Sequence, residues 1–353
     1  MNDQLQPFPP SASLSTPPAR RSTAGHWIAI FVLLLLLGIS VLANIILVII
    51  AATGAVVATG EGGLGSHKFV EERLGGKGRN KVVQIEVIGV ISYAGRRSLF
   101  GFEEDMATQI VRQIEAAEKD PDVIGILLLV DSPGGGVTAS DVIYDRLLRF
   151  KSSGERPRKV VTLMRDLAAS GGYYVSVAAD KIVAHRTTIT GSIGVLISAL
   201  NVRGLGEKLG IRDVTIKSGA NKDLLNPFRE PTAHETNILQ ATVNDLYDRF
   251  VSVVARSRGL EEAEVRELAD GRIYTATQAL EAHLIDEIGY EENALALMKQ
   301  LTGVEEFRRI RYRRSRTLAD ILTARLQPLV DLPVPERWRA ETPVVQYLWQ
   351  PEL

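Results

Sequence analysis

An uninterrupted apolar run near the N-terminus constrains this chain more than any other feature of its sequence. Trp27–Ala52 contains no charged residue and consists mostly of Leu, Ile, Val and Ala. A helix rises about 1.5 Å per residue, so the run is long enough to cross a hydrocarbon core of about 30 Å. A cleaved secretory signal would have a shorter apolar core, of about 7–15 residues. A buried core helix is disfavoured because the run is apolar on all sides and lies near the N-terminus. The sequence therefore predicts one retained transmembrane helix, within residues 25–58.

The charges that flank this run predict its orientation. Arg20 and Arg21 precede it, whereas the first charged residue after it is Glu61. Because Lys and Arg prefer the cytoplasmic side of a membrane, we expect the N-terminus in the cytoplasm and the C-terminal bulk outside it. The tail at residues 1–24 is rich in Pro, Ser, Thr and Gln and is expected to be disordered. The predicted localisation is the cell membrane, with a single pass.

The composition excludes several classes of function. The 353 residues carry a net charge of −1, without the basic excess of a dedicated nucleic-acid binder. There is no cysteine, which excludes disulfides, a thiolate nucleophile and a cysteine-ligated metal. The five histidines are scattered, and none forms an HExxH motif or an i, i+4 pair. Neither a metal nor a cofactor is therefore expected.

Alternating strand and helix patterns follow a glycine-rich linker predicted at residues 59–80. The expected strands are Val82–Ile91, Val123–Val130, Lys159–Met164, Lys181–Ala184 and Val214–Lys217. The expected helices are Glu103–Lys119, Val137–Phe150, a segment from Gly171, Pro231–Ser257 and Glu261–Ala269. This alternation predicts one α/β domain with a mostly parallel sheet over residues 81–303.

A basic and proline-containing tail is predicted at residues 304–353. Six arginines lie within Arg308–Arg316. Such a run could contact anionic lipid head groups, or it could be a solvated surface stretch.

Two glycine-rich loops follow predicted strands. Asp131–Gly136 comes directly after Val123–Val130, and Ala168–Tyr174 follows Lys159–Met164. Ligand sites in parallel α/β sheets form at the carboxyl ends of strands, where both loops are expected. Glycines allow backbone N–H groups to approach a substrate, and two such groups can form an oxyanion hole. The first loop matches neither GxxxxGK[ST] nor GxGxxG, which argues against nucleotide binding, while a tight turn without function stays possible.

Ser170 lies in the second loop, where a strand is expected to turn into a helix. That geometry exposes a hydroxyl, as in a nucleophile elbow, but it also suits an ordinary N-cap serine. A serine nucleophile needs a base, and the candidates are His185 and Lys222. A lysine acts as a base only when burial lowers its pKa from about 10.4 towards neutrality. The alternative for Lys222 is a surface lysine paired with Asp223, and the residues by themselves leave the choice open.

The order of several short motifs resembles a known family. These motifs are Asp131–Val137, Ala168–Tyr174, Thr190–Val195, Ile216–Asp223, Gly271–Tyr274 and Ala282–Gly289. Together they closely resemble the short, one-domain form of signal peptide peptidase A, a family of Ser-Lys peptidases. The resemblance covers roughly residues 81–300. It implies an α/β domain with a ClpP/crotonase-like fold, a mostly parallel sheet and flanking helices.

The resemblance also implies roles for individual residues. The nucleophile of the family's Ala-Ser-Gly-Gly motif falls on Ser170, and the general base of its Lys-Ser-Gly-x-x-Lys-Asp motif falls on Lys222. The oxyanion-hole glycine falls on Gly135, with Gly171 as the second donor. The chain departs from the family at His185, where a small residue or proline is usual, so this histidine could line the site without replacing the lysine.

The implied function is a membrane-anchored serine endopeptidase that cleaves hydrophobic peptides such as remnant signal peptides. It implies no cofactor and no nucleic-acid partner. The family assembles into ring-like homo-oligomers in which serine and lysine can come from neighbouring subunits. Two alternatives stay open: a crotonase-like acyl-CoA enzyme of the same fold, and an anchored, non-catalytic scaffold that binds peptides.

Overall fold

The computed structural model describes residues 24–59, 69–93, 95–98, 101–154, 157–314 and 346–348. It divides into two compact units, Met1–Ser66 and His67–Leu353.

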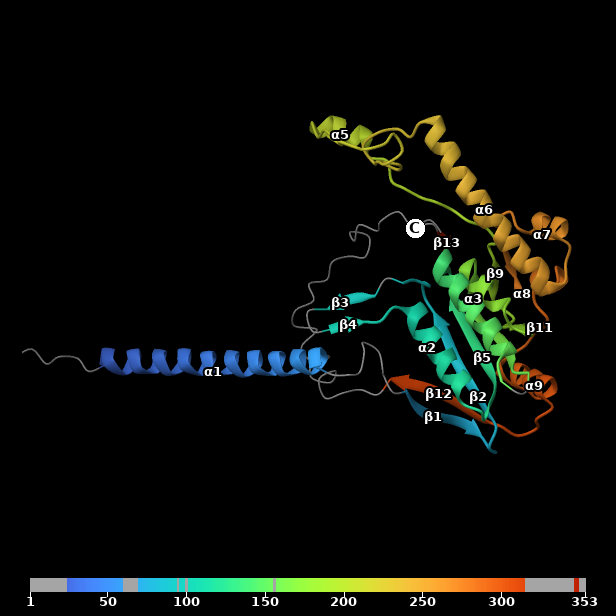
Figure 1. The fold of residues 1–353 in the computed structure, drawn as a ribbon, viewed down its shortest axis with the longest axis horizontal. Coiled ribbons are helices and arrows are strands. Elements are labelled where there is room, and N and C mark those ends of the chain that lie inside the picture. Colours follow the sequence, from blue (N-terminus) through green and yellow to red (C-terminus); the bar gives the residue numbers. More distant parts are fainter. Residues whose placement is uncertain are drawn as a thin grey trace, which may run out of the picture. The chain divides into compact units, whose positions relative to one another are not determined.

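The first unit contains one long helix, α1 (Ala24–Thr59), shown in blue in Figure 1. Its segment Trp27–Ile45 has a mean hydropathy of 2.8, and none of it is buried. Within the described residues, α1 is the one helix whose length and composition suit a membrane span. The predicted apolar helix is therefore present. The tail expected to be disordered lies, apart from Ala24, outside the described residues.

The second unit is built on a nine-stranded sheet within the described residues. Its strands are β1 (Phe69–Gly76), β2 (Lys81–Ile88), β5 (Val123–Ser132), β7 (Lys159–Ala169), β8 (Lys181–Ala184), β9 (Ile189–Gly191), β10 (Ile273–Thr275), β11 (Glu287–Ile288) and β12 (Arg308–Arg314). The order is β1-β12-β2-β5-β7-β8-β11, with β9 on β7 and β10 on β9. All neighbours are parallel except β1 with β12 and β9 with β10. The predicted, mostly parallel sheet is confirmed.

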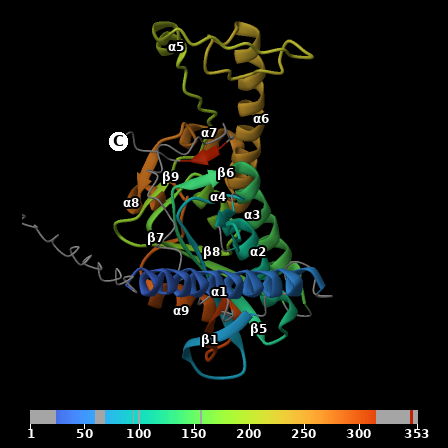
Figure 2. The same ribbon diagram turned by 90° about the vertical axis from the view of Figure 1, so that its left-hand side faces the viewer.

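Helices cover both faces of this sheet (Figures 1 and 2). The helices described in this unit are α2 (Met106–Lys119), α3 (Val137–Ser152), α4 (Gly171–Ser176), α5 (Arg203–Leu209), α6 (Ala233–Arg258), α7 (Glu262–Leu268), α8 (Ala276–Glu281) and α9 (Glu291–Thr302), of which α5 lies away from the sheet (Figure 1). Two small ladders complete the fold. One pairs β3 (Arg96–Ser98) with β4 (Gly101–Glu103), and the other pairs β6 (Gly134–Gly136) with β13 (Gln346–Leu348).

The apolar run in β5 shows why this sheet is buried on both sides. Successive strand residues point to opposite faces. Ile126 and Leu128 pack into the core that contains residues of α2, α3 and α4. Leu127 and Leu129 pack into the cluster that contains Met298 of α9. A strand covered on both faces needs continuous rather than alternating hydrophobicity, which is what the sequence of β5 supplies.

Two predictions are wrong for the residues that the structure describes: the linker at residues 59–80 and the tail at residues 304–353. Phe69–Gly76 is strand β1, and Arg308–Arg314 is strand β12, paired antiparallel with it. Strand β12 also pairs in parallel with β2, so both segments belong to the main sheet. The domain therefore extends beyond the predicted limits of 81 and 303 at both ends.

The physical reason lies in the alternation of β12. Ile310 is 3% exposed and Tyr312 is 8% exposed, so both contribute to the core. Arg311, which lies between them, and Arg313, which follows Tyr312, form ion pairs with Glu72 of β1, at 2.9 and 2.5 Å. Arg311 and Arg313 are thus paired with a carboxylate of the sheet rather than forming a row of free cations, although Arg313 stays exposed to solvent. The prediction of a tail considered only the number of charges and overlooked that arginines alternate here with apolar residues, which is typical of a strand.

The prediction of a strand at Val214–Lys217 is wrong. The structure gives it no strand pairing within the described chain. Ile216 is 97% exposed, and Val214 is also strongly exposed. The β-branched residues favour an extended backbone, but an isolated segment without a neighbouring strand cannot form a ladder. The other predicted strands and helices are present, with β7 extending to Ala169 rather than ending at Met164.

Candidate active site

The two glycine-rich loops meet at the carboxyl ends of β5 and β7. These strands are parallel neighbours, and their register places Ser132 opposite Ala168. Gly171 and Gly172 then begin α4, which packs against the first loop. A Cβ on Gly172 would lie 2.7 Å from the carbonyl oxygen of Ser132. Glycine is therefore required here by the close approach of the two backbones.

Ser170 occupies a strained turn between β7 and α4. Its φ of 55° and ψ of −116° lie outside the regions that non-glycine residues normally adopt. The turn is held by a hydrogen bond of 2.7 Å from its N–H to the Gly191 carbonyl, and Tyr174 N–H donates to its carbonyl. Its side chain makes no capping hydrogen bond to α4. The geometry therefore differs from that of an ordinary N-cap serine and resembles the strained strand-to-helix turn of a nucleophile elbow.

Gly135 and Gly171 lie side by side next to this serine. The point at which a Cβ would sit on Gly171 is 3.1 Å from the Gly135 nitrogen. Strand β6 is held in place by Ile91, whose N–H donates to Gly134 and whose carbonyl accepts from Gly136, both at 2.8 Å. The Gly171 N–H opens α4 and has no hydrogen-bond acceptor within the described residues. The structure thus brings together Ser170, Gly135 and Gly171.

Alanine at Gly135 is expected to be far more damaging than alanine at Gly136. A Cβ on Gly135 would lie 2.0 Å from the Ile91 carbonyl oxygen, whereas on Gly136 the nearest atom outside the chain neighbours is 3.7 Å away. We expect Gly135→Ala to displace β6 and to lower the free energy of unfolding by about 1–3 kcal/mol. Gly136→Ala should stay within about 0.5 kcal/mol of the wild type. Urea unfolding of the two variants measures this, and equal stability would contradict the packing described here.

Lys222 lies apart from these three residues in the single chain. It belongs to a segment that we call the arm, residues 196–232, which contains α5 and leads into α6 (Figure 1). Lys222 is exposed, whereas Ser170 is only 1% exposed. The structure shows no hydrogen bond between the Lys222 amine and any described residue. A single chain therefore does not join the predicted nucleophile and base.

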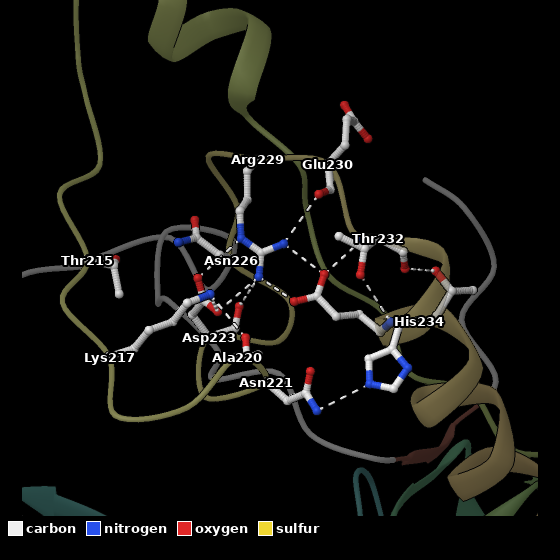
Figure 3. A network of polar contacts seen from close by, with 12 residues as sticks. Thr215, Lys217, Ala220, Asn221, Asp223, Asn226, Arg229, Glu230, Thr232 and His234 are labelled. Carbon is white, nitrogen blue, oxygen red and sulfur yellow. Dashed lines mark hydrogen bonds and ion pairs between the residues drawn. The ribbon is translucent and has the colours of Figure 1, made fainter.

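An ion-pair network fixes the loop that carries Lys222 (Figure 3). Asp223 is bound by Lys217 at 2.6 Å and by Arg229 at 3.0 Å. Arg229 also binds Glu235, at 2.5 and 2.8 Å. Asp223 therefore pairs with Lys217 and Arg229. The alternative prediction, a surface ion pair between Lys222 and Asp223, does not occur in this structure. The network holds the loop while leaving the Lys222 amine available.

This network should weaken at low pH. Hydrogen bonds from Arg229 and then Lys217 lower the pKa of Asp223 from 3.8 to about 2, and Arg229 and then Thr232 lower the pKa of Glu235 from 4.5 to about 2. Because both pKa values are depressed in the folded arm, their stabilisation is present above pH 4.5 and is lost as the pH falls towards 2. We expect amide hydrogen exchange in residues 217–235 to accelerate over this window, relative to β5. Unchanged protection of these amides at pH 2.5 would contradict the prediction.

His185, the other candidate base, lies just beyond β8. Its ring packs on Tyr290 at the start of α9, with ring centroids 5.2 Å apart. Within the described residues it makes no hydrogen bond with Ser170. The surroundings are those of a partly exposed aromatic contact.

Contacts that no sequence pattern predicted connect α4, the helix that follows Ser170, to α6. Tyr174 of α4 donates a hydrogen bond of 2.5 Å to Asp141 of α3, which also accepts from Arg249 of α6 at 2.8 Å. The Tyr174 ring stacks edge-on against Phe250 of α6, with centroids 4.9 Å apart. Asp141 and Arg249 are 108 residues apart in sequence, so no local sequence pattern predicts their contact. The capping box of Thr232 and Glu235, by contrast, follows a recognisable [ST]-x-x-[DE] pattern.

Comparison with known proteins shows which family models match the chain. The family model described as peptidase family S49 matches residues 153–305, which include Ser170 and Lys222. The Clp protease family model matches residues 99–202 and confirms, with the mostly parallel sheet, the predicted ClpP-like α/β fold.

Several known proteins are similar to most of this chain. A candidate signal peptide peptidase SppA of Enterococcus faecium is 42% identical over 254 residues, 72% of this chain and 73% of that protein. A candidate protease of Synechocystis sp., slr0021, is 40% identical over 64% of this chain and 76% of that protein. The chloroplastic serine protease SPPA of Arabidopsis thaliana is 31% identical over 70% of this chain and 36% of that protein.

Proposed function

This chain belongs to peptidase family S49, and from that premise we propose that it is a membrane-anchored serine endopeptidase with Ser170 as nucleophile and Lys222 as general base. Gly135 and Gly171 supply the oxyanion hole. The substrates are hydrophobic peptides in or beside the membrane, remnant signal peptides among them. The helix α1 anchors the chain by a single pass, with its N-terminus in the cytoplasm and the catalytic domain outside.

One observation carries this proposal: the strained turn at Ser170 leads directly into Gly171, whose backbone lies against that of Gly135. A serine with φ of 55°, without a capping bond and at the N-terminus of a helix, gains nothing in stability from its conformation. Its value is chemical, because a hydroxyl next to two backbone N–H groups suits acyl transfer. A serine hydroxyl beside two backbone N–H groups would suit any acyl-transfer reaction. Among these reactions, the similarity to peptidases favours peptide hydrolysis.

The chemistry follows from the groups named. Uncharged Lys222 Nζ accepts the proton of Ser170 as its Oγ bonds to the peptide carbonyl carbon, and the N–H groups of Gly135 and Gly171 stabilise the oxyanion. The C–N bond breaks as Lys222 returns the proton to the leaving amine. Water, giving a proton to Lys222, then attacks the ester, and Ser170 leaves with that proton.

The base reaches the nucleophile through assembly. Lys222 is exposed on the arm, whose apolar side chains Leu200, Val214 and Ile216 are exposed as well. Large apolar side chains exposed together on one segment are what an interaction surface would bury. In a ring-like homo-oligomer, the arm of one subunit would cover the Ser170 site of the next. Burial there would favour the uncharged amine that the mechanism requires.

Labelling with a serine-reactive peptidyl phosphonate tests the proposal. The intact chain in detergent micelles should form a covalent adduct on the peptide that contains Ser170, detected by mass spectrometry. Ser170→Ala should remain unlabelled, and Ser176→Ala, which removes another buried hydroxyl of α4, should be labelled like the wild type. Absence of labelling in the assembled wild type would favour the peptide-binding scaffold, and turnover of acyl-CoA thioesters would favour the crotonase-like enzyme.

A further inference from the structure

The long helix α1 carries an amide side chain inside its apolar run. Asn44 is the one residue of Trp27–Ala52 with an amide group, and it lies eight residues before Ala52, about 12 Å along a helix. The whole run is about 39 Å long, so a hydrocarbon core of about 30 Å centred on it would contain Asn44. At that depth there is no water to bond with the amide.

The structure satisfies this amide only in part. The Asn44 Nδ2 donates a hydrogen bond of 2.8 Å to the Ser40 carbonyl, one turn earlier. Within the described residues the structure gives the Asn44 side chain no further hydrogen bond, so its Oδ1 and one N–H remain unpaired. An unpaired polar group in hydrocarbon costs free energy, which favours a partner outside α1. Since α1 is the one described helix that suits a membrane span, we expect that partner to come from another polypeptide.

One face of α1 accompanies Asn44. Leu33, Leu37, Ser40 and Asn44 follow one another at spacings of four, three and four residues, which places them on one side of a helix. All four side chains are exposed in the structure. The small Ser40 would let a second helix approach closely, while the two leucines would pack beside it.

A second copy of α1 is the partner that this chemistry fits. An amide both donates and accepts hydrogen bonds, so two Asn44 side chains can satisfy each other. In a symmetric, parallel pair the second copy presents its own Asn44 at the same depth. A different membrane protein would need a polar group of its own at that depth and on a matching face.

We propose that copies of α1 associate in parallel through the face formed by Leu33, Leu37, Ser40 and Asn44, with the Asn44 amides hydrogen-bonded across the contact. This interaction goes beyond the peptidase function and rests on one part of the proposed function, the membrane anchor. It needs neither catalysis nor any residue of the second unit.

Disulfide crosslinking in the full chain tests which face is in contact, because the sequence contains no cysteine. Leu37→Cys lies on the proposed face, and Leu35→Cys, the matched control, lies about 160° away from it around the helix. Membranes that contain either variant are oxidised with copper phenanthroline, and the disulfide-linked dimer is quantified on non-reducing gels. Leu37→Cys should form this dimer about tenfold faster than Leu35→Cys.

Substitution of Asn44 in the Leu37→Cys chain tests the hydrogen bond itself. Asn44→Leu removes the amide and should lower the rate of dimer formation about fivefold. Asn44→Gln keeps an amide and should stay within about twofold of the parent chain. Equal rates for Leu37→Cys and Leu35→Cys would overturn the proposal. So would a rate that Asn44→Leu leaves unchanged, or adducts with another protein in place of the dimer.

Two further measurements separate this proposal from the peptidase function. The chain should stay in the membrane during extraction with alkaline carbonate, and its release would overturn the anchor and the helix contact together. Peptide cleavage by the same membranes reports the peptidase independently. A chain that shows the expected crosslinking but no cleavage would refute the peptidase and keep the contact. An active, membrane-bound chain with equal crosslinking at positions 35 and 37 would do the reverse.

Discussion

Replacing Ser170 by alanine is expected to lower the kcat for peptide cleavage by about 10⁴-fold or more, because no other group can form the acyl-enzyme. The free energy of unfolding should not fall. The Ser170 hydroxyl makes no capping hydrogen bond. Alanine at this position would also have to adopt a φ of 55°, so its backbone strain would be similar to that of serine. Steady-state kinetics with a fluorogenic hydrophobic peptide and urea unfolding measure the two quantities.

Ser176→Ala is the matched control for this experiment. Ser176 is a buried serine of the same helix, and its hydroxyl donates a hydrogen bond of 2.7 Å to the Gly172 carbonyl. We expect it to lose about 1 kcal/mol of stability and to keep its activity within about threefold. Peptide cleavage by Ser170→Ala at more than a tenth of the wild-type rate would exclude Ser170 as the nucleophile.

The second large effect is expected at Lys222. Lys222→Ala should lower kcat by about 10³-fold or more, because a serine hydroxyl attacks poorly without a base. Lys222→Arg should be equally inactive, since a guanidinium keeps the positive charge but does not accept a proton near neutral pH. Lys208→Ala, which removes another exposed lysine of the arm, should retain activity. His185→Ala should leave most of the activity, and the reverse pattern at 185 and 222 would transfer the role of base to the histidine.

Mixing inactive variants tests whether the base comes from a neighbouring subunit. In a ring whose sites combine Ser170 of one subunit with Lys222 of the next, co-assembly of Ser170→Ala with Lys222→Ala completes about a quarter of the sites. Activity should therefore return to about a quarter of the wild-type value. The control is a mixture of Ser170→Ala with the doubly substituted chain, which should stay inactive. A mixture of the single variants without activity would show that the two groups must belong to one chain.

Patterns within single segments were sufficient for much of this fold. The uncharged run at Trp27–Ala52 predicts α1 because helix length and bilayer thickness are both known. The continuous apolar run of β5 predicts a strand covered on both faces, and α9 and the α2–α4 helices provide that cover. Two parallel strands that each end in a glycine-rich loop also place those loops together, because their carboxyl ends share one edge of the sheet.

Pairings between distant segments required the tertiary structure. A run of arginines predicts a surface segment, yet β12 is an inner strand of the sheet. Its Ile310 and Tyr312 are buried, and they alternate with arginines whose carboxylate partners lie about 230 residues away in sequence. Val214–Lys217 has the residues of a strand, but the described chain offers it no partner. Ser170 has the sequence of a helix cap, whereas its φ of 55° comes from its bond to Gly191 and from packing against the first glycine loop. Side-chain periodicity is a property of a few consecutive residues, so it can be recognised within one segment of the sequence. Hydrogen-bonded partners and backbone strain depend instead on which remote segments the folded core brings into contact.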